Sequence, residues 1–133
     1  MGMTIEVTSG TIATLLEEAA KAAPTECCGL LLGRDGKVEI ALPAANVAPD
    51  PSCRFEIDPA ALFAAHRGAR DGGPQLLGYY HSHPDGHPVP SATDCERASG
   101  DHRVWAIVAG GAVAFWRDGP GGFEALCYAV VAE

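Results

Sequence analysis

The sequence predicts a single α/β or α+β domain in which helices pack on a mixed, largely antiparallel β-sheet. Short apolar segments typical of strands alternate along the chain with segments that have helical spacing. Two hairpin signals, Asp35-Gly36 and Ala109-Gly110-Gly111, indicate that some neighbouring strands are antiparallel. The chain has 133 residues, of which 47% are hydrophobic and 20% are charged, so it can bury one core. We expect residues 1–133 to form one domain.

The first half of the chain is expected to begin with a strand and a helix and to continue as a hairpin. The elements are a strand over 4–8, a helix from an N-cap at Ser9 to a stop at Pro24, and paired strands over 27–33 and 37–42. The helix has an apolar face made of Ile12, Leu15, Leu16, Ala19 and Ala23. The strand at 27–33 is almost continuously apolar, which indicates that it is buried.

The second half is expected to add two helices and five strands. They are a strand over 53–57, a helix over 59–70, a strand over 75–83, a short helix over 91–99, and closing strands over 104–108, 112–116 and 123–131. Proline-rich loops are expected over 43–52 and 85–90. Asp58 and Pro59 favour an N-cap followed by a first helical turn, with Leu62, Phe63 and His66 on one side of that helix.

Composition narrows the classes of partner. The net charge is −8, from 17 acidic and 9 basic side chains, which disfavours nucleic acid and anionic membranes. The sequence has no secretory signal and no apolar run near the ~20 residues that span a bilayer, so we expect a soluble, cytoplasmic protein. Five cysteines without a Cys-x-x-Cys pair indicate reduced, mostly buried thiols.

The most informative segment joins two histidines to a later aspartate. His81 and His83 are two positions apart on an expected strand, so their side chains should share a face while Ser82 points away. Asp94 follows in the first turn of a helix and would complete the two-nitrogen, one-oxygen donor set of a catalytic zinc with an open fourth position. Each residue also has an ordinary interpretation. A single histidine is usually structural, and Ser91-x-x-Asp94 is also the pattern of a capping box.

These residues resemble the JAMM, or MPN-plus, metallopeptidases, whose motif is a distant Glu, then His-x-His, seven residues and Ser-x-x-Asp. His81, His83, Ser91 and Asp94 match that spacing at every position. The segment from Glu26 to Gly33, Glu-Cys-Cys-Gly-Leu-Leu-Leu-Gly, is similar to the family's segment around the distant Glu. The resemblance implies the family's fold, which is similar to that of cytidine deaminases. The His-x-Glu and Pro-Cys-x-x-Cys motifs of the deaminases themselves are absent from the sequence.

The resemblance also implies a chemistry. One Zn²⁺ per chain, with a bound catalytic water, would be held by His81, His83 and Asp94, and Glu26 would act as the general base. Ser91 would stabilise the oxygen of the tetrahedral intermediate. The expected reaction is hydrolysis of a peptide or isopeptide bond at the Gly-Gly tail of a ubiquitin-like or sulfur-carrier protein. The alternative is a non-catalytic MPN scaffold that binds a protein partner. The substrate's identity, the oligomeric state, and the roles of His87 and the cysteines stay open.

Overall fold

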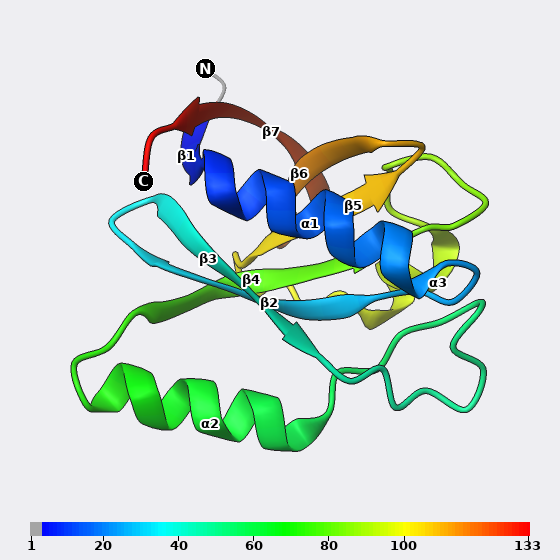
Figure 1. Ribbon diagram of the computed structural model, residues 1–133, viewed down its shortest axis with the longest axis horizontal. Coiled ribbons are helices and arrows are strands. Elements are labelled where there is room, and N and C mark those ends of the chain that lie inside the picture. The colour runs from blue at the N-terminus through cyan, green and yellow to red at the C-terminus, as the bar shows by residue number, and fades with distance from the viewer. Residues whose placement is uncertain (1–3) are drawn as a thin grey trace.

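The computed structural model describes residues 4–133. In chain order the elements are β1 (Thr4–Thr8), α1 (Ser9–Ala22), β2 (Cys28–Arg34), β3 (Lys37–Ala44), α2 (Pro59–Arg70), β4 (Gln75–Ser82), α3 (Ala92–Arg97), β5 (Val104–Ala109), β6 (Ala112–Gly119) and β7 (Gly122–Val131). Helix α1 lies across one face of the sheet, and α2 lies along the opposite side (Figure 1). The expected α/β class is confirmed.

The strands form one mixed sheet that closes into a barrel in the order β1-β3-β2-β4-β5-β6-β7. Strand β1 is parallel to both β3 and β7, and β4 is parallel to β5. The four remaining pairings are antiparallel. Helices packed on a mixed sheet were expected, but the closure was not, because it depends on β1 pairing with strands far away in the sequence.

Both hairpin turns have the geometry that their sequences predict. The central residues of the β2–β3 turn, Asp35 and Gly36, have φ values of 52° and 75°, and those of the β5–β6 turn, Gly110 and Gly111, have 57° and 76°. Two consecutive residues with positive φ are the requirement of a type I′ turn, whose twist matches that of the paired strands. The turns therefore set the register of β5 with β6 and of β2 with β3 next to the turn, up to a register shift between Leu32 and Gly33.

Helix α1 buries its apolar side against the inner face of the sheet, where Leu15 is fully buried. The main core on this face comprises Ile5, Val7, Leu15, Cys27, Leu31, Val38, Ala41, Tyr80, Val104, Ala106, Val108, Phe115 and Leu126. The N-cap is Thr8, whose side chain accepts a hydrogen bond from Thr11 N at 3.3 Å. The expected N-cap at Ser9 is therefore wrong by one residue, because Ser9 already has a helical backbone.

Helix α2 begins as predicted, with the Asp58 carboxylate accepting a hydrogen bond from Ala60 N at 3.0 Å. The side that carries Leu62, Phe63 and His66 is not buried as a whole. Ala65 is buried, whereas Phe63 is 60% exposed and His66 is also exposed. The Arg67 guanidinium lies 5.0 Å from the centre of the Phe63 ring and covers part of it.

The expected strand over 53–57 is wrong, because β3 extends to Ala44 and the chain then forms an irregular loop. Its only sheet-like contact among the described residues is a bridge between Asn46 and Ile57. The Asn46 side chain occupies the hydrogen-bonding positions that a strand partner would take, since its Oδ1 accepts from Ala48 N and Glu56 N, both at 3.1 Å.

All five cysteines are free, but only Cys27 and Cys28 are buried. The expectation of mostly buried thiols is therefore wrong for Cys53, Cys95 and Cys127, which are exposed. Within residues 4–133, none of the helices is both long and apolar enough to cross a membrane.

Candidate metal centre

The two histidines lie where β4 ends. His81 is in the strand beside Ile107 of β5, and His83 follows the last strand residue while its N–H still donates to Val108 O at 2.8 Å. The strand alternation therefore continues through His83 and places both imidazoles on one face. Their Nε2 atoms are 3.1 Å apart. His81 is fully buried, whereas 13% of the His83 side chain is exposed.

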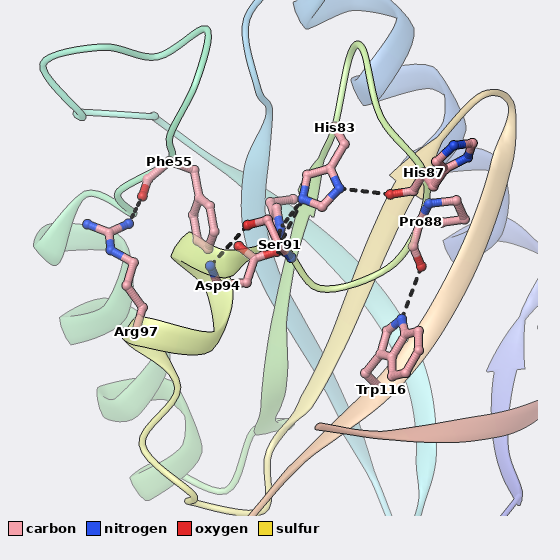
Figure 2. A network of polar contacts seen from close by, with 9 residues as sticks. Phe55, His83, His87, Pro88, Ser91, Asp94, Arg97 and Trp116 are labelled. Atoms are coloured by element: carbon pink, nitrogen blue, oxygen red, sulfur yellow. Dashed lines mark hydrogen bonds and ion pairs between the residues drawn. The ribbon is translucent and has the colours of Figure 1, made fainter. Parts of the chain in front are cut away.

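Asp94 reaches the histidines from the first turn of α3. Its Oδ2 lies 3.0 Å from His81 Nε2 and 3.2 Å from His83 Nε2. Ser91 is the N-cap, and its Oγ accepts from Asp94 N at 3.0 Å while its N–H donates to Asp94 Oδ2 at 2.9 Å. The capping box is thus present, and it aims the carboxylate at the two rings. Figure 2 shows Ser91, Asp94 and His83 in this arrangement. The capping contact of Asp94 is therefore compatible with its expected role as a metal ligand.

The three side chains form a donor set that could hold a metal ion. Their nearest donor atoms form a triangle with sides of 3.0 to 3.2 Å. Tetrahedral zinc with bonds of about 2.0 to 2.1 Å places neighbouring donors roughly 3.3 Å apart, so small outward shifts would suffice. His83 Nδ1 lies 2.9 Å from His87 O, which can only accept a hydrogen bond, so Nδ1 carries a proton. Loss of the proton that Nε2 donates to Asp94 would leave Nε2 free to bind a metal.

The charges of the three side chains suit the binding of a metal ion. Burial raises the pKa of Asp94, but hydrogen bonds from His81 and His83 outweigh it and hold that pKa well below its usual range. The carboxylate is therefore an anionic donor at neutral pH. Burial lowers the pKa of His81, which keeps its imidazole neutral, and the hydrogen bond to Asp94 raises the pKa of His83. A metal ion would thus displace a proton from the triad.

Glu26 lies between the end of α1 and the start of β2 and is 8% exposed. Burial raises the pKa of its carboxyl to about 7. His83 and Asp94 are close enough for their charges to act on it, with the first lowering and the second raising this pKa. A carboxyl with this pKa can both take and release a proton near neutral pH.

Ser82 connects the segment that carries Glu26 to the strand that carries the histidines. Its Oγ accepts from Cys27 N at 2.9 Å, and its N–H donates to Cys27 O at 3.2 Å. Ser82 points away from the two imidazoles, as predicted, and this orientation is what lets it bond the residue after Glu26. Cys28 is not a nucleophile in this setting, because burial raises the pKa of its thiol to about 12.

Aromatic residues near the centre were missed by the sequence analysis. The Phe55 ring stacks on His81, with ring centres 4.2 Å apart and planes 17° from parallel. Arg97, one turn after Asp94, donates to Phe55 O and lies over its ring (Figure 2). Arg97 lies three residues after Asp94, and this helical spacing, which puts the two side chains on the same face, is the one sequence signal that could have predicted its place near the centre. Trp105 contacts His81 edge to face at 5.7 Å.

A cleft of about 410 Å³ adjoins these aromatic residues. Its apolar walls include Phe55, Leu62, Tyr79 and Trp105, and Arg97 lies at its polar side. The loop on the other side of the centre is held by Trp116, whose Nε1 donates to Pro88 O at 3.1 Å (Figure 2). His87 in that loop is exposed and contributes its carbonyl to the centre, whereas His66 and His102 are exposed elsewhere.

Comparison with known proteins identifies the family. Residues 8–119 match the model described as prokaryotic homologs of the JAB domain. The chain is 43% identical over 93 residues to the desampylase of Haloferax volcanii, in a match that covers 68% of this chain and 67% of that protein. It is 36% identical over 97 residues to a probable TtuB-protein conjugate cleaving protease of Thermus thermophilus, covering 73% and 65%. The matched region thus spans about two thirds of each relative.

Solved structures agree with this relationship. A protein of Desulfitobacterium hafniense, 29% identical, superposes with a TM-score of 0.85 over 97% of this chain and 94% of its own. A JAB1/MPN domain protein from Archaeoglobus fulgidus, 20% identical, has the same fold, with a TM-score of 0.65 over 96% of this chain and all of its own. The chain therefore belongs to the family of prokaryotic JAB-domain homologues, within the JAMM/MPN proteins.

Proposed function

We propose that this chain is a zinc-dependent isopeptidase that cleaves after the Gly-Gly tail of a ubiquitin-like or sulfur-carrier protein. The observation that carries the proposal is the triangle of His81, His83 and Asp94, together with a buried Glu26 carboxyl on which the charges of His83 and Asp94 act. A desampylase and a conjugate-cleaving protease among the relatives support the reaction class. We also propose that residues 1–133 act as one domain, since all seven strands belong to one closed sheet.

His81 Nε2, His83 Nε2 and Asp94 Oδ2 would hold one Zn²⁺. When bound, zinc supplies positive charge that polarises the scissile carbonyl and makes water acidic enough to ionise near neutral pH. The carbonyl of His87 keeps His83 in the metal-binding tautomer, and the Ser91 backbone N–H keeps Asp94 aimed at the rings. Both contacts resist the rotation of a ligand away from the metal.

Glu26 would take the proton from the attacking water and deliver it to the departing amine. Its pKa of about 7 suits both transfers, because the proton is bound neither too weakly nor too strongly. Ser91 would donate to the oxygen of the tetrahedral intermediate. Its Oγ accepts from Asp94 N and so uses only a lone pair, which leaves the hydroxyl hydrogen available for that oxygen.

A test uses a ubiquitin-like protein joined through Gly-Gly to a lysine side chain, with cleavage followed by mass spectrometry. We expect cleavage that a zinc chelator abolishes and added Zn²⁺ restores. The Glu26→Gln variant is the matched control for contaminating protease, because it should keep zinc and lose most cleavage. A zinc-loaded wild type that binds the substrate but cleaves nothing would favour the scaffold alternative over the peptidase.

A further inference from the structure

The side chain of Asn46 uses its full hydrogen-bonding capacity on the loop that carries it and on the backbone of Glu26. Its Nδ2 donates to Glu26 O at 2.9 Å and to Arg54 O at 3.0 Å. Its Oδ1 accepts from Ala48 N and Glu56 N, both at 3.1 Å. An asparagine side chain has two N–H donors and two oxygen lone pairs, so none is left for solvent. Asn46 therefore acts as the internal scaffold of a loop without regular structure.

This loop, residues 45–58, reaches the metal centre at two points. Pro51 O accepts a hydrogen bond from Glu26 N at 2.7 Å. Phe55 stacks on the ring of His81 at 4.2 Å. Asn46 bonds the loop backbone at Ala48, before these two contacts, and at Glu56, after them. The loop conformation that it stabilises therefore positions both contacts.

The backbone of Glu26 depends on this loop because it lies in neither α1 nor β2. Its N–H is held by Pro51 O, and its C=O is held by Asn46 Nδ2. Both peptide groups that set the direction of the Glu26 side chain are thus bonded to the loop. We propose that Asn46 is a positioning residue that fixes the Glu26 carboxyl relative to the metal centre. This inference rests on the proposed function, in which Glu26 is the base.

Misplacing a reacting group by about 1 Å can lower turnover by about 10²-fold, which sets the scale of the test. The Asn46→Asp variant keeps the side-chain shape and the acceptor oxygen but cannot donate to Glu26 O. We expect kcat to fall by about 10- to 10²-fold, with KM changed by less than about 3-fold and zinc content unchanged. Asn46→Ser, which is too short to reach Glu26 O, serves as the second variant if the aspartate prevents folding.

The matched control is Asp58→Ala, which removes the N-cap of α2 at the end of the same loop without touching Glu26. It should lower stability as a lost cap does, with kcat within about 2-fold of wild type. A kcat loss in Asn46→Asp no larger than in this control would reduce Asn46 to a structural residue. In the Glu26→Gln background, Asn46→Asp should cause no further loss of kcat, because its effect acts through the base. An equal loss in both backgrounds overturns the inference.

Amide hydrogen exchange in the zinc-free protein provides a readout that does not need activity. In Asn46→Asp the Glu26 amide, bonded to Pro51 O, should lose about 10-fold or more of its protection, whereas the Leu31 amide within β2 should keep its protection. Unchanged protection of Glu26 contradicts the positioning role. If the zinc-loaded wild type cleaves nothing, the proposed function is wrong. The protection of the Glu26 amide still tests Asn46 in that case, because its loss in Asn46→Asp supports the positioning role and its retention contradicts it.

Discussion

Replacing Glu26 by Gln should stabilise the zinc-free protein at pH 8 relative to pH 5. Burial raises the pKa of Glu26 from 4.5 to about 7, so the folded state binds a proton that the unfolded state releases. The cost of ionising the buried carboxyl is nearly absent below the unfolded pKa. It grows as the pH rises from 4.5 to about 7 and is complete above 7. Gln has the same shape but no charge, so the variant does not have this cost.

The size of this pH effect on stability follows from the difference between the folded and unfolded pKa values of Glu26. A carboxyl whose pKa is 4.5 unfolded and about 7 folded costs roughly 1 kcal/mol of stability at pH 5 and roughly 3 kcal/mol at pH 8. The stability of Glu26→Gln relative to wild type should therefore increase by about 2.5 kcal/mol between these two pH values. Comparing the two pH values removes any constant cost of burying the Gln amide.

Urea unfolding of metal-free wild type and variant at both pH values measures this difference. With a slope of about 1–3 kcal/mol/M, the relative midpoint should move by about 0.8 to 2.5 M. Asp58→Ala is a suitable control because it removes the cap of α2 and leaves Glu26 unchanged. A relative midpoint that is the same at pH 5 and pH 8 would refute the argument that Glu26 is a buried, destabilised base.

Three further predictions concern the metal and the oxyanion. Ser91→Ala should lose about 0.5–2 kcal/mol of stability in thermal melts and about 10²–10³ in kcat, and unchanged kcat would leave Ser91 only as the cap. Elemental analysis should find one zinc per wild-type chain and none in Asp94→Ala, whereas zinc-free wild type that takes up no added Zn²⁺ would end the zinc proposal. Because the hydrogen bond to Asp94 raises the pKa of His83, zinc should bind more weakly as the pH falls through that pKa and reach constant affinity above it. Competition with a chromophoric chelator between about pH 5.5 and 8 measures this trend, and a Kd independent of pH contradicts it.

The arrangement of the proposed metal ligands could be predicted because it depends on local rules. Alternation in a strand puts His81 and His83 on one face, and first-turn geometry with a Ser91 cap aims Asp94 outward. These rules operate over a few residues and are visible in the sequence. The Glu26 assignment is different, because no local pattern separates a base from a surface acid. Only the resemblance of the segment that it begins pointed to it.

The surroundings of the centre could not be predicted because they depend on where an irregular loop packs. Residues 53–57 have the apolar and aromatic content of a strand, yet Asn46 takes up the backbone hydrogen bonds of this segment. Phe55 consequently stacks on His81 instead of joining a sheet. Side-chain hydrogen bonds to the backbone compete with strand pairing, and propensity alone does not reveal the outcome.

The pairing of β2 with β4 positions Glu26 relative to the proposed metal ligands. Cys28 lies opposite His81 in this antiparallel pair, and Cys27 exchanges two hydrogen bonds with Ser82, 55 residues away in sequence. This register places Glu26 just beyond the ladder, where the charges of His83 and Asp94 act on its carboxyl. A slip of one residue in β4 would turn both histidines toward the α1 side and Ser82 toward the metal centre, because strand side chains alternate. The apolar residues of β4 oppose such a slip, since the fully buried Tyr80 would leave the core. The hydrophobic pattern that stabilises the sheet therefore also fixes the geometry on which the proposed reaction depends.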